Sequence, residues 1–193
     1  MNRKDFITEQ LEESSDMKIK MITECDISIS EAADLLIDCV KAGNKILLCG
    51  NGGSAADSQH LATEFMIRLS HDLDRPAIAA IALTTDSSNL TAGGNDIGFD
   101  NVLARNVEGL GSEGDVLIAI STSGNSRNII KAVEKAHEKK MQVIGFLGGD
   151  GGQLMPLVQV PIIIPSDNTQ RIQEGHITVG HILCELTERE IYG

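Results

Sequence analysis

The sequence lacks any long hydrophobic segment, and its longest apolar run, residues 77–83, is far too short to span a bilayer. No apolar stretch follows the charged N-terminus, so we expect neither a signal peptide nor a membrane partner. Basic residues are scarce: 16 Lys and Arg against 28 Asp and Glu give a net charge of −12, which argues against nucleic acid as a partner. The four cysteines show no C-x-x-C spacing, which favours reduced thiols in a cytoplasmic protein over a disulfide framework.

The sequence does contain a regular alternation of short apolar runs and helical stretches, and its 193 residues are enough for one α/β domain. Such alternation predicts a doubly wound, mainly parallel five-stranded sheet. The expected strands cover residues 46–49, 77–83, 115–120, 142–147 and 158–164. The expected helices cover about residues 54–69, then 99–110 after an interruption at 93–96, then a stretch up to about 139, and finally 169–190.

Two further helices are expected before the first strand, over residues 3–25 and from Ser28 or Ser30 to Gly43. Their apolar residues form a long, imperfect stripe. These helices could cover the sheet as an extra layer, or they could present a surface to other subunits, and the length of the stripe favours the second. We therefore assign residues 1–43 to oligomerisation and residues 44–193 to the α/β core of a single domain.

The glycine-rich segment 50–54 links the first strand to an alanine-rich helix. Its glycines let the backbone approach a ligand, and the N–H groups at the start of the helix can hold an anion. Ser54 is expected to cap this helix. His60 and Glu64 share one face of it. They could be a solvated surface pair, part of a metal site with ligands from elsewhere, or a site with Glu64 as general base, and the last two are compatible.

A second loop, residues 121–126, places four hydroxyl groups in six residues between a buried strand and a helix. Hydroxyl and N–H groups at a helix N-terminus form a neutral phosphate cradle, so we interpret this loop as a phosphate site. The alternative is an ordinary turn with serine caps. The sequence has no G-x-x-x-x-G-K-[ST] motif, so the loop is not a P-loop for nucleotide hydrolysis.

The last expected helix carries Gln173, His176 and His181. His176 is expected to be structural or to face solvent. His181 lies among apolar residues, so a hydrogen-bonded core histidine is an alternative to a functional one. Gln173 and His181 are eight positions apart, roughly 12 Å along a regular helix, so they do not easily reach one ion from a straight helix. Either the helix is irregular near Gln173 or subunits share the site.

Four segments together resemble the sugar isomerase (SIS) family and, within it, the phosphoheptose (sedoheptulose-7-phosphate) isomerases: CGNGGSAADSQH, GND at 94–96, STSGNS, and RIQE with a following histidine. The resemblance covers nearly the whole chain. It implies a flavodoxin-like SIS fold and an intramolecular oxidoreductase that converts D-sedoheptulose 7-phosphate to D-glycero-D-manno-heptose 7-phosphate through an enediol. This reaction begins the synthesis of nucleotide-activated heptoses for surface polysaccharide such as lipopolysaccharide. A cytoplasmic homotetramer with one zinc ion per subunit is also implied.

The resemblance also implies roles for residues at matching positions. Glu64 and His181 would be the catalytic proton-transfer pair. The zinc ligands would be His60, Glu64, Gln173 and His181. The residues that would bind the phosphorylated seven-carbon sugar are Asn51, Gly52, Gly53, Ser54, His60, Glu64, Asn95, Asp96, Ser121, Thr122, Ser123, Ser126 and Gln173, with the four hydroxyl-bearing residues of the 121–126 loop holding its phosphate.

Two other functions of SIS proteins are alternatives to the enzyme. A non-enzymatic SIS relative binds the replication initiator DnaA; it shares the serine loop but lacks residues corresponding to the glutamate and the histidine. The presence of Glu64 and His181 favours the enzyme. A sugar-phosphate-sensing regulator would carry a DNA-binding domain, for which an acidic chain of 193 residues leaves no room.

Overall fold

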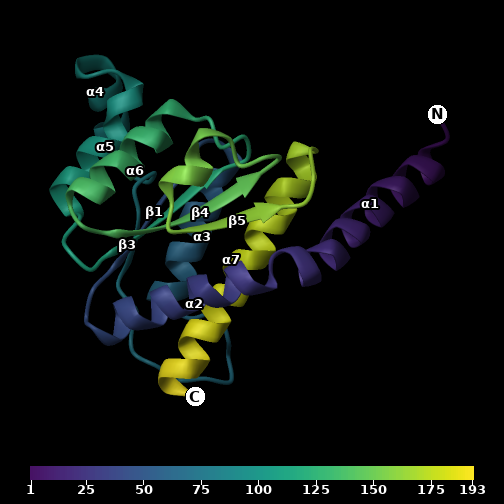
Figure 1. Ribbon diagram of the computed structural model, residues 1–193, viewed down its shortest axis with the longest axis horizontal. Helices are drawn as coiled ribbons and strands as arrows, with labels where there is room; N and C mark the ends of the chain where they lie inside the picture. Colours follow the sequence, from purple (N-terminus) through teal and green to yellow (C-terminus); the bar gives the residue numbers. More distant parts are fainter.

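A computed structural model describes all residues from Met1 to Gly193, and Figure 1 shows a central sheet with helices packed on both faces. The strands are β1 (Ile46–Cys49), β2 (Ala80–Ala82), β3 (Val116–Ser121), β4 (Gln142–Gly148) and β5 (Val160–Ile164). They lie in the order β2-β1-β3-β4-β5, and every pairing is parallel. This is the flavodoxin-like order, so the predicted doubly wound five-stranded sheet is confirmed.

The helices are α1 (Arg3–Glu24), α2 (Asp26–Lys41), α3 (Gly53–Met66), α4 (Ser87–Asp96), α5 (Phe99–Leu110), α6 (Arg127–Glu138) and α7 (Thr169–Tyr192), with a 3-10 helix η1 (Gly152–Leu157). Successive strand residues point to opposite faces of the sheet. Ile46 and Leu48 therefore pack with α2, α3 and α7, while Leu47 and Cys49 pack with α5 and α6. Because both faces are covered, β1 and β3 are apolar and buried along nearly their whole length.

The strand order reverses between β1 and β3, the neighbours at the centre of the sheet. In open α/β sheets, ligands bind in the crevice beyond the carboxyl ends of the strands at such a point. The loops that leave β1 and β3 are the glycine-rich segment 50–52 and the hydroxyl-rich segment 122–125. The topology therefore brings together the two loops that the sequence singled out separately.

Three local predictions from the sequence are wrong. Only Ala80–Ala82 of the run 77–83 is a strand, because the backbone N–H of Ile78 bonds to the carbonyl of Phe65 in α3 instead of to the sheet. Helix α2 begins at Asp26, before Ser28 and Ser30. Residues 93–96 do not interrupt a helix but complete α4, and the break falls at Gly98, whose φ of 81° a glycine adopts readily.

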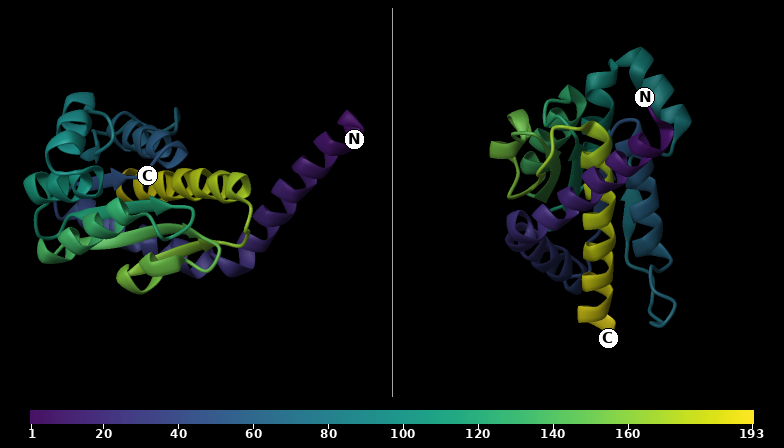
Figure 2. Two further views of the ribbon diagram at one scale, coloured as in Figure 1. Left: turned by 90° about the horizontal axis from the view of Figure 1, so that it is seen from above. Right: turned by 90° about the vertical axis from the view of Figure 1, so that its right-hand side faces the viewer.

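Helix α1 stands out from the rest of the chain as an arm (Figures 1 and 2). Its second half packs on the body through Met17 and Met21, which are buried. Its first half leaves Phe6 and Leu11 43% and 67% exposed. Within one chain, therefore, only part of the apolar stripe predicted from the sequence is buried. None of the helices combines the length and the apolar character that a membrane span needs.

Candidate active site

The loop after β1 is joined to the start of α6 by its central asparagine. The side-chain amides of Asn51 and Asn128 donate to each other's carbonyl oxygens. Gly52, with φ of 55°, is the N-cap of α3, and Ser54 is buried in the first turn, so Ser54 does not cap the helix as expected. Asn51 and Gly52 line a cavity of about 200 Å³, and its apolar lining includes Leu90, Phe99 and Leu103.

The hydroxyl-rich loop keeps its functional groups close together at the end of β3. The Oγ atoms of Ser121 and Ser126 are 3.1 Å apart, while Ser123 is exposed. Ser126 is the N-cap of α6 but makes no side-chain capping bond, so its hydroxyl pairs with that of Ser121 and keeps further hydrogen-bonding capacity for a ligand. A methyl group on Gly124 would lie 2.0 Å from the Gly151 carbonyl oxygen, so the loop after β4 fixes the shape of this one. The arrangement suits a phosphate held by neutral donors.

A cluster of three side chains joins α3 to α7. Nε2 of His60 lies 3.4 Å from Oε1 of Glu64 and 2.8 Å from Nε2 of His181. One ligand-type atom from each of the three residues lies within 4.8 Å of the other two. His60 is exposed and the other two are half-buried, so the cluster faces solvent at the edge of the α3–α7 contact. One chain thus supplies both members of the expected proton-transfer pair, and His181 is not a core histidine.

Asp57, one turn before His60, was not singled out by sequence analysis. Its Oδ2 atom is buried and has no hydrogen-bond partner. Burial raises the pKa of this carboxyl, while His60 and His181 lower the pKa when they are charged. Carboxylates in the outer shell of metal sites hydrogen-bond to histidine ligands and orient them, and Asp57, one turn before His60 on α3, is placed to take such a role once its free oxygen finds a partner.

The described residues therefore fit a metal of the zinc class. Two imidazole nitrogens and one carboxylate oxygen match the His₂Glu set of catalytic zinc sites, which leave a position open for substrate. Tetrahedral zinc with bonds of about 2.0–2.1 Å needs nitrogen ligands about 3.3 Å apart. The two imidazoles would therefore have to separate by about 0.5 Å from their present contact, a small side-chain adjustment.

Gln173 is not part of this cluster. Its Nε2 atom lies 2.7 Å from the point that a Cβ on Gly53 would occupy, at the first turn of α3, about 10 Å along that helix from His60. Helix α7 is regular from Thr169 to Tyr192, so the alternative of an irregular helix near Gln173 is wrong. If subunits share the site, Gln173 would come from another subunit, because His181 already lies beside Glu64 of its own chain.

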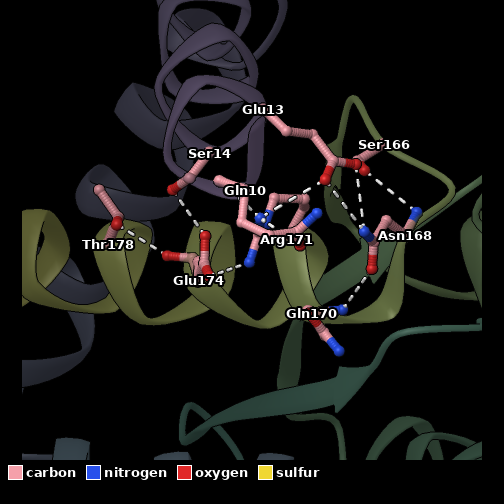
Figure 3. Close-up of polar contacts among 9 residues, drawn as sticks. All are labelled: Gln10, Glu13, Ser14, Ser166, Asn168, Gln170, Arg171, Glu174 and Thr178. Carbon is pink, nitrogen blue, oxygen red and sulfur yellow. Dashed lines mark hydrogen bonds and ion pairs between the residues drawn. The ribbon is translucent and has the colours of Figure 1, made fainter. Parts of the chain in front are cut away.

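The start of α7, which carries Gln173, is anchored to α1 by a buried arginine (Figure 3). Arg171 donates through Nη1 to the Gln10 carbonyl oxygen at 2.7 Å and through Nη2 to Glu174 at 2.6 Å. Ser14 of α1 donates to the other carboxylate oxygen of Glu174. The base of the α1 arm and the first turns of α7 are therefore held as one unit.

Asn95 and Asp96 do not join the cavity within one chain. Both are exposed at the end of α4, where the Asn95 amide donates to Asp96 at 2.7 Å. Asn128 could not be identified from the sequence because its partner, Asn51, is distant along the chain. Asp57 could not be identified because its free carboxylate oxygen has no partner. The apolar wall of the cavity was missed because it comes from two different helices, and only the structure brings them together.

Comparison with known proteins connects this geometry to a family. The SIS domain model matches residues 11–148. The chain is 48% identical over 192 residues to a phosphoheptose isomerase of Clostridium acetobutylicum, covering 98% of this chain and 97% of the relative. The structure of phosphoheptose isomerase from Neisseria gonorrhoeae is 42% identical and superposes with a TM-score of 0.90, covering 96% of this chain and 98% of that chain. The Francisella tularensis enzyme is 38% identical, with a TM-score of 0.93 over 98% of this chain and 100% of that one.

These similarities extend over almost the full length of each protein, so they include the helices before the sheet as well as the SIS core. They support an isomerase enzyme and give no support to the DnaA-binding alternative. The polar loops at the switch point and the His60–Glu64–His181 cluster thus lie in a chain that matches phosphoheptose isomerases over almost its full length. The chain belongs to the phosphoheptose isomerase family of SIS-domain proteins.

Proposed function

We propose that this protein interconverts D-sedoheptulose 7-phosphate and D-glycero-D-manno-heptose 7-phosphate. The observation that carries the proposal is the convergence of the Glu64 carboxylate and the His181 imidazole from two helices of one chain. Aldose–ketose isomerisation moves a proton between C1 and C2, and a carboxylate base with a neighbouring acid–base group suits that task. The names of the relatives described above supply the substrate class.

Glu64 takes the proton from one carbon of the open-chain sugar and returns it to the other, through a cis-enediol. His181 moves the accompanying proton to or from the oxygens, since a neutral imidazole both donates and accepts. Ser121, Thr122, Ser123 and Ser126 hold the phosphate with neutral donors, and Asn51 to Ser54 line the sugar. Asn95, Asp96 and Gln173, which one chain does not bring to the cluster, would complete the sugar site in the assembled protein.

His60, Glu64 and His181 would hold a zinc ion, one per subunit, with Gln173 of a neighbouring subunit as a fourth ligand. When bound, the ion would polarise the sugar oxygens and organise the site. Glu64 cannot be a fully committed ligand and a free base at the same moment, so its carboxylate must remain partly free during proton transfer. Asp57 would orient the two imidazoles.

The assembly we propose is a homotetramer built on the N-terminal helices. The α1 arm exposes Phe6, Ile7 and Leu11, and a groove of about 410 Å³ between α1, α2 and α7 is half apolar in its lining. Two unpartnered apolar surfaces on adjacent elements fit pairing between copies of the chain. The groove is larger than the cavity at the glycine loop, but it lacks the polar loops that a sugar phosphate requires.

The reaction would take place in the cytoplasm, where the four buried cysteines stay reduced, and would supply nucleotide-activated heptose for surface polysaccharide. The test is to incubate the purified protein with sedoheptulose 7-phosphate and follow the aldose by NMR. Formation of the heptose 7-phosphate, with no comparable turnover of a five-carbon ketose phosphate, would support the proposal. No aldose from the seven-carbon ketose at high enzyme concentration, with and without added zinc, would contradict it.

A further inference from the structure

Arg75 lies outside every helix and strand, yet its side chain is only 1% exposed. Its guanidinium reaches back to the last turn of α3. Nη2 donates to the carbonyl oxygen of Glu64 at 2.8 Å, and Nη1 donates to that of Phe65 at 2.9 Å. These carbonyls belong to the last four of the helix, which have no partner within it. Arg75 therefore caps the helix end that carries Glu64, and its charge suits the negative end of the helix dipole.

The same guanidinium is paired with α7. Nε of Arg75 donates to Oε2 of Glu188 at 2.8 Å, and the side chain of Glu188 is also only 1% exposed. The other oxygen, Oε1, accepts from the backbone N–H of Ser70 at 3.1 Å. Burial alone would raise the pKa of Glu188, but the hydrogen bonds and charge of Arg75 and the bonds from Ser70 lower it. The carboxylate is thus fully engaged and ionised.

The position of Glu188 on α7 relates this pair to the active site. Glu188 and His181 are seven residues apart, two turns of helix, so both side chains project from the same face of α7 toward α3. Helices α3 and α7 pack against each other, and Leu61 lies against Gly180, beside the contact of His60 with His181. One guanidinium therefore links the backbone of Glu64 to the helix face that presents His181.

We propose that Arg75 and Glu188 are positioning residues that set the placement of Glu64 relative to His181. This role rests on the proposed isomerisation, in which Glu64 and His181 act on one substrate. This role requires arginine. A lysine at this position could still pair with Glu188, but its ammonium group has no planar fork of donors and could not hold the carbonyls of Glu64 and Phe65 in fixed directions. A shift of 1 Å in a catalytic group is enough to cost about a hundredfold in rate.

The experiment compares Arg75→Lys and Glu188→Gln with the unmodified protein in D₂O. Three quantities are measured below the melting temperature of every variant: kcat, KM, and the number of solvent deuterons incorporated into the sugar per turnover. We expect kcat to fall about ten- to a hundredfold and KM to change little, because the phosphate loop is not touched. We also expect the deuterons per turnover to change, since this ratio depends on how the base is placed and not on how much protein is folded.

Two control variants separate positioning from stability. Val133→Ala removes methyl groups from the buried face of α6 and lowers the melting temperature without touching α3 or α7. Arg189→Lys makes the same chemical change as Arg75→Lys at an exposed ion pair on α7, the helix that carries Glu188. Both controls should keep the deuterium ratio of the unmodified protein. The proposal is overturned if Arg75→Lys and Glu188→Gln also keep that ratio and lose kcat only in proportion to their folded fraction.

A substrate-free measurement keeps the test independent of the reaction. The ring resonances of His60 and His181 should shift in Arg75→Lys and in Glu188→Gln and stay unchanged in Val133→Ala. Should the unmodified protein fail to convert sedoheptulose 7-phosphate, the proposed function falls, and these resonances still decide whether Arg75 sets the placement of the cluster. Unchanged resonances in folded Glu188→Gln would overturn the positioning role even if Arg75→Lys did not fold.

Discussion

Asn51 and Asn128 are 77 positions apart in the sequence and exchange two hydrogen bonds, at 2.9 and 2.8 Å, between their side-chain amides. The pair fastens the loop after β1, which lines the proposed sugar cavity, to the first turn of α6, which follows the hydroxyl-rich loop. The two loops that we propose to bind the substrate are therefore set relative to each other by one reciprocal contact across the switch point of the sheet.

Asn128→Ala removes both of these bonds and leaves the Asn51 amide free to turn. We expect KM for the sugar phosphate to rise about tenfold, since two neutral hydrogen bonds contribute about 0.5–1.5 kcal/mol each, while kcat stays within about twofold. Steady-state kinetics measure this split. Asn101→Ala, which removes a half-buried amide on α5 that accepts from Lys131, is the matched control. A fall in kcat at unchanged KM would show that the pair serves the chemical step and not substrate placement.

Ser123→Ala tests the phosphate cradle. Ser123 is exposed, so its loss should leave the melting temperature without ligand almost unchanged. A ligand that binds only the folded state raises the melting temperature more when it binds more tightly, so inorganic phosphate should protect the variant less than the unmodified protein. Differential scanning fluorimetry across a phosphate series gives the answer. Equal protection of both proteins would place the phosphate elsewhere.

His176 predicts a pH dependence of stability. It is 1% exposed and donates through Nε2 to the Leu147 carbonyl at 2.9 Å. Burial lowers its pKa from 6.5 to about 4. Between these values the unfolded chain binds a proton that the folded chain does not, so the free energy of unfolding falls as the pH drops from about 6.5 toward 4.

His176→Gln removes that titration. Between pH 7 and pH 5, the unmodified protein should lose about 2 kcal/mol more of its unfolding free energy than the variant loses. Urea unfolding at the two pH values measures the difference, and because both proteins share all other titrating groups, the comparison isolates His176. Identical pH slopes would mean that the imidazole is already charged or hydrated in the folded state.

The metal proposal predicts a graded loss of zinc affinity. His60→Ala and His181→Ala should each weaken binding by at least about tenfold, and Asp57→Asn by about 10–100-fold through the orientation of the imidazoles. His71→Ala, an exposed histidine in the loop after α3, should have no effect. Competition with a fluorescent chelator measures each affinity. Zinc binding that survives unchanged in both histidine variants would remove the metal from this site.

The sheet could be predicted from the sequence because strands buried on both faces read as continuous apolar runs, and β1, β3 and β4 lie within one residue of their expected bounds. The edge strand β2 could not be delimited in the same way. Its alanine-rich run is uniform, so nothing local shows that Ile78 bonds to α3 instead of to β1. Which part of such a run pairs is decided by tertiary contacts.

Part of the geometry of the candidate site could be predicted from local spacing, as for His60 and Glu64 on one helical face. His181 was identified by resemblance, and the structure brings it to those two residues. Asn128 and Arg75 could not be found, because each acts through a partner that only the fold brings close. Asp57 carries no local signal either, since an aspartate early in a helix is ordinarily solvated.

The central claim is that Glu64 transfers the proton, and Glu64→Gln in D₂O tests it most directly. Glutamine keeps the size of the side chain but cannot act as a base, so turnover of sedoheptulose 7-phosphate should fall by at least about 10²-fold. Incorporation of solvent deuterium into the sugar should fall with it, while protection by inorganic phosphate should equal that of the unmodified protein. Turnover and deuterium incorporation close to those of the unmodified protein would contradict the account.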